Sequence, residues 1–269
     1  MYWVIQSNLT HGRDVQELPP ILERAGIPYS LHKVVPFVGD IEPDVNPEGN
    51  VIVIGAYSLR NLAKRKGWIP GSFDLADLTY EEHFAHWGAY MLNRDAIFCT
   101  FEDAPKHFHA ERLFMRPVVD SKFFSGAVIS REELLHWHHK VLELKEDDGS
   151  NLRGSTMVLL ATLKNIQREY RIWVVDGRVV TASLYRQGYN VIYCSDVEPM
   201  ILDFAQARAD EWSPQRAYVL DIALTPAGLH IIETNTLNAA GLYAADISKL
   251  VAAIEDMSFP VLDNVPVTR

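Results

Sequence analysis

The chain has 269 residues, of which 48% are hydrophobic and 22% charged, a composition typical of a globular protein with a substantial core. Its formal net charge of -10 argues against a general nucleic-acid binder, because such proteins carry basic surfaces that neutralise phosphates. No apolar run approaches the ~20 residues of a membrane span, and the N-terminus lacks a signal-peptide pattern. Cys99 and Cys194 are expected to be free thiols. We therefore expect a cytoplasmic protein that binds neither nucleic acid nor membranes.

The first third of the chain alternates strands and helices. We predict strands at residues 2–7, 29–35 and 51–54, with helices at 15–25 and 59–66. Such alternation predicts a small α/β layer with a parallel sheet. From about residue 96 the strands become longer and hairpin-like, at 96–101, 113–119, 156–160, 169–175, 178–186, 218–225 and 229–235, with helices at 131–144, 198–211 and 244–256. The pattern predicts an α/β domain at 1–93 followed by an α+β region at 94–269.

A cation lies inside the apolar strand predicted at residues 113–119. Arg116 is followed directly by Pro117, which places this strand at an edge or an end of its sheet. Lys122 comes six residues after Arg116, just before a Ser-Gly turn whose backbone amides could hold a phosphate. Either these cations contact an anion, or Arg116 extends from the strand end into solvent.

A hairpin rich in arginine follows at residues 169–186. Asp176-Gly177 between β-branched strands predicts a two-residue type I′ turn. Counting from that turn places Arg171 opposite Ala182 and Glu169 opposite Leu184. One face then carries Glu169, Arg171, Trp173, Val180 and Arg186. Two guanidiniums on one face indicate a clamp for carboxylate or phosphate, and the alternative is a structural Glu-Arg pair on a solvated face.

A second hairpin, at residues 218–235, carries two acids within apolar strands. With Pro226-Ala227-Gly228 as a three-residue loop, Asp221 faces Glu233, and Asn235 shares their face. Opposed carboxylates repel each other, and a hard cation such as Mg²⁺ relieves that repulsion with oxygen ligands. The alternatives are two solvated carboxylates on an edge hairpin, or a four-residue loop that puts the two acids on opposite faces.

Taken in order, these segments resemble the ATP-grasp superfamily, in particular the branch of predicted peptide ligases in which an Arg replaces a usual Lys. The resemblance covers about residues 96–243, and the first third is compatible with the pre-ATP-grasp domain that precedes such folds. It implies that Asp221, Glu233 and Asn235 bind magnesium, and that Arg171 and Arg186 lie near the transferred phosphoryl group. It also implies ATP contacts at a set of five residues: Arg116, Lys122, Leu160, Ala161 and Glu169.

The implied activity is the joining of a carboxylate to an amine with ATP and Mg²⁺, through an acyl phosphate and with release of ADP. The substrates would be amino acids, peptides or a protein terminus. Two other functions fit the same residues, namely a phosphotransferase that acts on a hydroxyl and a protein that senses nucleotide without turnover. The sequence identifies neither substrate and gives no oligomeric state.

Overall fold

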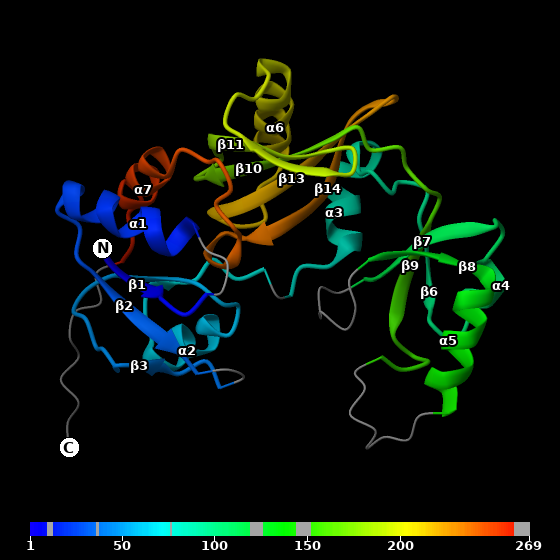
Figure 1. Ribbon diagram of the computed structural model, residues 1–269, viewed down its shortest axis with the longest axis horizontal. Helices are drawn as coiled ribbons and strands as arrows, with labels where there is room; N and C mark the ends of the chain where they lie inside the picture. The colour runs from blue at the N-terminus through cyan, green and yellow to red at the C-terminus, as the bar shows by residue number, and fades with distance from the viewer. Residues whose placement is uncertain (10–12, 36–37, 76, 119–125, 144–151, 261–269) are drawn as a thin grey trace. The chain divides into compact units, whose positions relative to one another are not determined.

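The computed structural model describes residues 1–9, 13–35, 38–75, 77–118, 126–143 and 152–260 (Figure 1). The chain divides into two compact units. The first contains Met1–Leu75, Arg168–Ile222 and the residues from Glu233 onward, and the second contains Ala76–Gln167 and Ala223–Ile232. The division at residue 93 therefore stays a prediction about the extent of the nucleotide-binding region. None of the described helices is long and apolar enough to cross a membrane.

The first unit contains a five-stranded sheet in the order β3-β2-β1-β4-β5. As predicted, β1 is parallel to both β2 and β4. The short edge strand β3 pairs antiparallel to β2, and the sequence did not reveal it or β5. The elements are β1 (Tyr2–Gln6), α1 (Arg13–Ala25), β2 (Tyr29–Val34), β3 (Ile41–Glu42), β4 (Val51–Ile54), α2 (Leu59–Lys66) and β5 (Pro70–Gly71).

A second five-stranded sheet, in the order β12-β11-β10-β13-β14, carries the two predicted hairpins. Helices α6 and α7 both contact β10 and β11 of this sheet. Helix α7 begins three residues later than predicted, because the Asp246 side chain accepts a hydrogen bond from the Lys249 N–H and caps the helix. The elements are β10 (Arg168–Val175), β11 (Arg178–Gln187), β12 (Asn190–Cys194), α6 (Pro199–Glu211), β13 (Ala217–Thr225), β14 (Gly228–Thr236), η2 (Leu237–Ala239) and α7 (Ile247–Glu255).

The second unit contains an antiparallel four-stranded sheet in the order β6-β9-β7-β8, with α4 and α5 packed beside it (Figure 1). Helix α3 begins with a capping box in which Thr79 and Glu82 bond each other's backbone N–H groups, a signal present in the sequence that we did not use. The elements are α3 (Tyr80–Trp87), η1 (Gly88–Tyr90), β6 (Ile97–Thr100), α4 (Ala104–His107), β7 (Arg112–Pro117), β8 (Ala127–Ser130), α5 (Arg131–Glu143) and β9 (Met157–Ala161).

One apolar core connects the two sheets of the first unit. Trp3, Ile5 and Ile52 of the parallel sheet belong to the same buried cluster as Trp173 and Val219 of the second sheet. Helices α1 and α7 contribute to this cluster as well. The hairpins that carry the predicted site are therefore built directly onto the core of the first unit, which limits how far their backbone can move.

Asn238, just after β14, is a buried polar side chain within this unit, and its replacement by alanine should lower the free energy of unfolding by roughly 2–4 kcal/mol. Its Nδ2 donates to the Val53 carbonyl at 2.6 Å, and its Oδ1 accepts from the Phe73 N–H at 2.8 Å. Alanine would leave both backbone groups unpaired in the interior. Denaturant unfolding measures the change. Asn61→Ala on exposed helix α2 is the control and should stay within about 0.5 kcal/mol of the wild-type value.

Candidate functional site

The inner face of the second sheet changes from apolar to polar along its strands. Side chains two residues apart on a strand share a face, so Trp173 and Val219 lie on the face that carries Arg171 and Asp221. Trp173 and Val219 are fully buried in the core of the first unit, whereas Arg171 is partly exposed. The candidate site therefore begins where the core ends.

Arg171 and Asp221 form a buried, two-pronged ion pair across β10 and β13. The Arg171 Nε donates to Asp221 Oδ1 at 2.9 Å, and its Nη2 donates to Oδ2 at 2.8 Å. The two side chains are only 11% and 3% exposed. Burial raises the pKa of Asp221 above its usual range, and the nearby Glu233 and Glu169 raise it further, whereas the hydrogen bonds from Arg171 act in the opposite direction. Such a carboxylate needs a cation beside it to remain charged.

Asn235 connects Asp221 to Glu233. Its Nδ2 donates to Asp221 Oδ2 at 3.1 Å and lies 3.2 Å from Glu233 Oε1. The three side chains therefore gather on one side of the β13–β14 hairpin, and their role as metal ligands stays a prediction. The turn is shorter than predicted, because β14 already begins at Gly228. The φ of 110° at Gly228 explains why glycine stands there, although it belongs to the strand and not to the loop.

The turn of the arginine hairpin is confirmed, but its strand register is not. Asp176 and Gly177 both have positive φ, at 45° and 73°, as a type I′ turn requires. Two bulges on β11 then shift the pairing, so that Arg171 lies opposite Ser183 and not Ala182. Glu169 lies opposite Arg186 and not Leu184. Each bulge inserts one extra residue into β11, which a count from the turn cannot detect.

The second bulge brings two neighbouring side chains of β11 onto one carboxylate. The Tyr185 hydroxyl donates to Glu169 Oε2 at 2.7 Å, and Arg186 Nη1 lies 3.2 Å from Glu169 Oε1. Burial raises the pKa of Tyr185, and the carboxylates of Asp221 and Glu169 add to the rise, so the hydroxyl stays protonated and donates. Glu169 is thereby held in place on the same face as Arg171.

Three tyrosines that the sequence analysis missed stack beside this cluster. The Tyr243 ring lies between those of Tyr185 and Tyr193, at centroid distances of 5.2 and 4.9 Å. The guanidinium carbon of Arg171 lies 4.7 Å from the Tyr243 ring centroid and 5.6 Å from that of Tyr185. Tyr243 has a φ of 47°, which is rare for a residue other than glycine and often marks a functional site. The position of Tyr185 next to Arg186 on the hairpin was the one available sequence signal.

The other predicted nucleotide contacts belong to the second unit. Arg116 in β7 lies over the Tyr80 ring, with 5.9 Å between its guanidinium carbon and the ring centroid. Leu160 and Ala161 in β9 are almost fully buried, so only their backbone could contact a nucleotide. Lys122 lies outside the described residues. The segment after β9 is fixed by Asp95, which accepts a hydrogen bond from the Thr162 N–H at 3.1 Å and forms an ion pair with Lys164 at 2.5 Å.

The charges of the cluster leave room for a further cation. Three carboxylates, from Glu169, Asp221 and Glu233, face two guanidiniums, from Arg171 and Arg186. The Asn235 Nδ2 lies within 3.2 Å of both Asp221 and Glu233, so carboxylate oxygens from two strands point at one position. Hard oxygen donors of this kind fit Mg²⁺ once the amide turns its oxygen inward. Among the described residues no group of three or more His, Cys, Asp or Glu side chains is placed to hold a metal ion, so the amide is a necessary part of this set.

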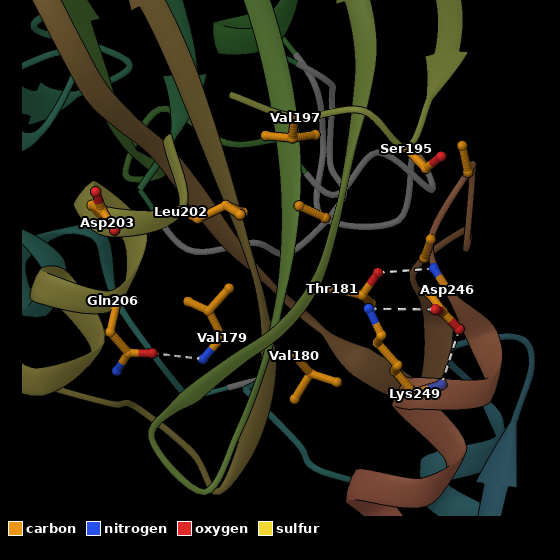
Figure 2. A pocket seen from close by; sticks show the side chains of 13 residues that line it. Val179, Val180, Thr181, Ser195, Val197, Leu202, Asp203, Gln206, Asp246 and Lys249 are labelled. Carbon is orange, nitrogen blue, oxygen red and sulfur yellow. Dashed lines mark hydrogen bonds and ion pairs between the residues drawn. The ribbon is translucent and has the colours of Figure 1, made fainter. Parts of the chain in front are cut away.

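The first unit also has a pocket of about 730 Å³ that none of these site residues lines (Figure 2). Its walls come from β11, α6 and the start of α7, where the Val179 N–H donates to Gln206 Oε1 and the Asp246 N–H donates to Thr181 Oγ1. Asp203, Asp246 and Lys249 give it charges of both signs. The ion-pair cluster and this pocket are therefore distinct features of the same unit.

Comparison with protein families identifies the fold. Residues 49–254 match the model of the ATP-grasp domain, family 3 of the R-to-K clade, and every residue of the cluster lies within that range. The chain belongs to this ATP-grasp family. The resemblance predicted from the motif order, including the branch, is thus confirmed, as is the ATP-grasp fold. No curated protein sequence matches the chain.

Solved structures with this ATP-grasp fold cover nearly the whole chain. D-alanine–D-alanine ligase from Bacillus anthracis matches with a TM-score of 0.60 and 13% identity, over 94% of this chain and 92% of that one. The D-cycloserine synthetase DcsG matches with 0.60 and 13%, over 94% and 98%. The ATP-grasp ligase PsnB, complexed with its precursor peptide PsnA2 and AMPPNP, matches with 0.55 and 14%, over 94% and 96%. At these identities the likeness concerns the fold.

Proposed function

We propose that this chain is an ATP- and Mg²⁺-dependent ligase that joins a carboxylate to an amine and releases ADP. The observation that carries the proposal is the buried Arg171–Asp221 pair, with Glu233 and Asn235 beside it, in a chain that belongs to the ATP-grasp family. The ligases among its structural neighbours support the same general activity. The proposed substrates are amino acids, peptides or protein termini.

In the proposed reaction the substrate carboxylate attacks the γ-phosphorus of ATP, which forms an acyl phosphate and releases ADP. The amine nitrogen then attacks the acyl carbon, phosphate leaves with the bonding electron pair, and the amine loses a proton. Bound Mg²⁺ would supply positive charge beside the phosphate oxygens. The chain needs no nucleophile of its own in this chemistry, and positioning and electrostatic stabilisation carry the catalysis.

Each cluster residue has a proposed part in this reaction. Asp221, Glu233 and Asn235 supply the oxygen ligands for the metal. Arg171 and Arg186 neutralise charge on the transferred phosphoryl group, since guanidinium binds phosphate oxygens in pairs. Glu169 orients Arg186 through their ion pair and contributes to the nucleotide site. Arg116, Lys122 and the backbone at Leu160 and Ala161 are the proposed ATP contacts from the second unit.

An ADP-release screen tests the proposal. Amino acids and short peptides are offered singly and in pairs with ATP and Mg²⁺, hydroxylamine is added to trap acyl phosphate, and products are identified by mass spectrometry. We expect ADP release that depends on a carboxylate substrate, together with a hydroxamate or amide product. A phosphoester product would identify a phosphotransferase. ATP binding without turnover across the screen would favour a nucleotide sensor, and either result would overturn the ligase proposal.

A further inference from the structure

Both oxygens of the Asp221 carboxylate are occupied by one arginine. The Arg171 Nε and Nη2 lie 2.9 and 2.8 Å from Oδ1 and Oδ2, and the pair is shielded from water by its burial. A charge-assisted, two-pronged hydrogen bond of this kind is among the stronger interactions that a carboxylate forms. A metal ion that approached Asp221 would therefore have to compete with Arg171.

Asn235 presents its amide nitrogen, and not its oxygen, to the acidic pair. The Nδ2 lies 3.1 Å from Asp221 and 3.2 Å from Glu233, because two carboxylates can accept hydrogen bonds but cannot donate them. A cation needs oxygen from all three side chains, so the amide has to rotate before it can act as a ligand. The arrangement around Asp221 and Glu233 is complete without a metal.

We propose that Arg171 and the Asn235 amide nitrogen stand in for the divalent cation, and that metal binding displaces Arg171 from Asp221. The inference rests on the metal site of the proposed function and adds an exclusive choice: Asp221 binds either the guanidinium or the metal. The guanidinium keeps the acidic pair neutralised before metal binds, so the protein folds without it. Once displaced, Arg171 has free donors for an anion at the moment when metal and triphosphate arrive together.

The tyrosine stack gives the displaced arginine a place to remain. Its guanidinium carbon already lies 4.7 Å from the Tyr243 ring centroid and 5.6 Å from that of Tyr185, within the range of a cation–π interaction. Tyr243 is itself held between two other rings and has an unusual backbone conformation. Arg171 can therefore leave Asp221 without losing all of its partners, which makes two defined positions for one side chain.

Mn²⁺ binding in the absence of nucleotide tests this competition. Free Mn²⁺ is measured by electron paramagnetic resonance during titration of the wild type, Arg171→Met and Arg216→Met. Apparent affinity falls with the fraction of molecules able to bind, so a pair that is open in about one molecule in ten lowers metal affinity about tenfold. We expect Arg171→Met to bind Mn²⁺ about tenfold more tightly than the wild type. Equal or weaker binding by Arg171→Met would overturn the inference.

Arg216→Met is the matched control. Arg216 makes the same two-pronged contact with Asp176, with both distances 2.7 Å, but this pair is exposed and lies at the hairpin turn. Its loss should leave Mn²⁺ affinity unchanged. A gain of the same size in Arg216→Met would show that any removed positive charge has this effect, which also counts against displacement.

A measurement on the wild type does not depend on whether Arg171→Met folds. The Nε–H proton of Arg171 should exchange slowly with water in the metal-free protein. Its resonance should shift and exchange faster when diamagnetic Mg²⁺ is added together with AMPPNP. An unchanged Nε–H resonance on saturation would mean that the pair persists, and displacement would be wrong. Neither readout involves turnover, so tighter Mn²⁺ binding without ADP release in any screen would retain this inference and reject the ligase.

Discussion

Asp221→Asn should abolish the thermal stabilisation of this protein by ATP and Mg²⁺. The substitution keeps the size of the side chain but removes the charge that the metal and Arg171 share. A metal worth several kcal/mol at the transition state would be lost with it. We expect kcat/KM to fall by about 10³-fold, which corresponds to about 4 kcal/mol. Thermal melts with and without ATP and Mg²⁺, followed by steady-state kinetics, measure both effects.

The same variant has to be separated from a folding defect. Breaking a buried ion pair leaves one charge without its partner, and we expect Asp221→Asn to lose roughly 2–4 kcal/mol of unfolding free energy. Circular dichroism at a temperature well below the melting transition checks that the variant is folded during the assay. Asp203→Asn, an exposed acid on α6 outside the cluster, should retain full stabilisation by ATP and Mg²⁺. Stabilisation of Asp221→Asn equal to that of the wild type would remove Asp221 from the metal site.

The parts of the site that could be predicted follow from local rules. Asp176-Gly177 specifies its turn because few other residue pairs adopt positive φ at both positions. Strand alternation alone places Glu169 and Arg171 on one face. The same rules gave the parallel pairing of β1 with β2 and β4, since each strand is a short apolar run separated from the next by a helix or loop.

The parts that could not be predicted depend on contacts between distant segments. A bulge costs one residue of register and has no sequence signature of its own, so the pairing of Arg171 with Ser183 was out of reach. Tyr243 follows the carboxylate hairpin by several residues, and only the folded chain brings it between Tyr185 and Tyr193. The protonated hydroxyl of Tyr185 on Glu169 depends on the second bulge in the same way. Arrangement around the charged groups, more than their identity, is what the sequence leaves open.

Arg171→Met should reduce turnover far more than ATP binding. Methionine retains much of the apolar stem of arginine but removes every donor that could meet a developing phosphoryl charge. Loss of one such donor group typically costs 10²–10³-fold in kcat, and we expect a loss of about that size with KM for ATP changed less than about fivefold. An interaction that forms mainly in the transition state lowers kcat and kcat/KM together. Steady-state kinetics with the substrates found by the screen give both constants.

The opposite signs expected for one substitution make this prediction hard to satisfy by accident. Arg171→Met should bind free Mn²⁺ more tightly and yet turn over more slowly, because the guanidinium competes with metal in the resting protein and helps phosphoryl transfer after displacement. A generally damaged site would lose both properties, and a purely structural arginine would lose stability without a selective fall in kcat. Arg216→Met removes the same chemical group from an exposed pair and should change neither constant. A loss of turnover in Arg216→Met as large as in Arg171→Met would show that the kinetic effect does not come from the site.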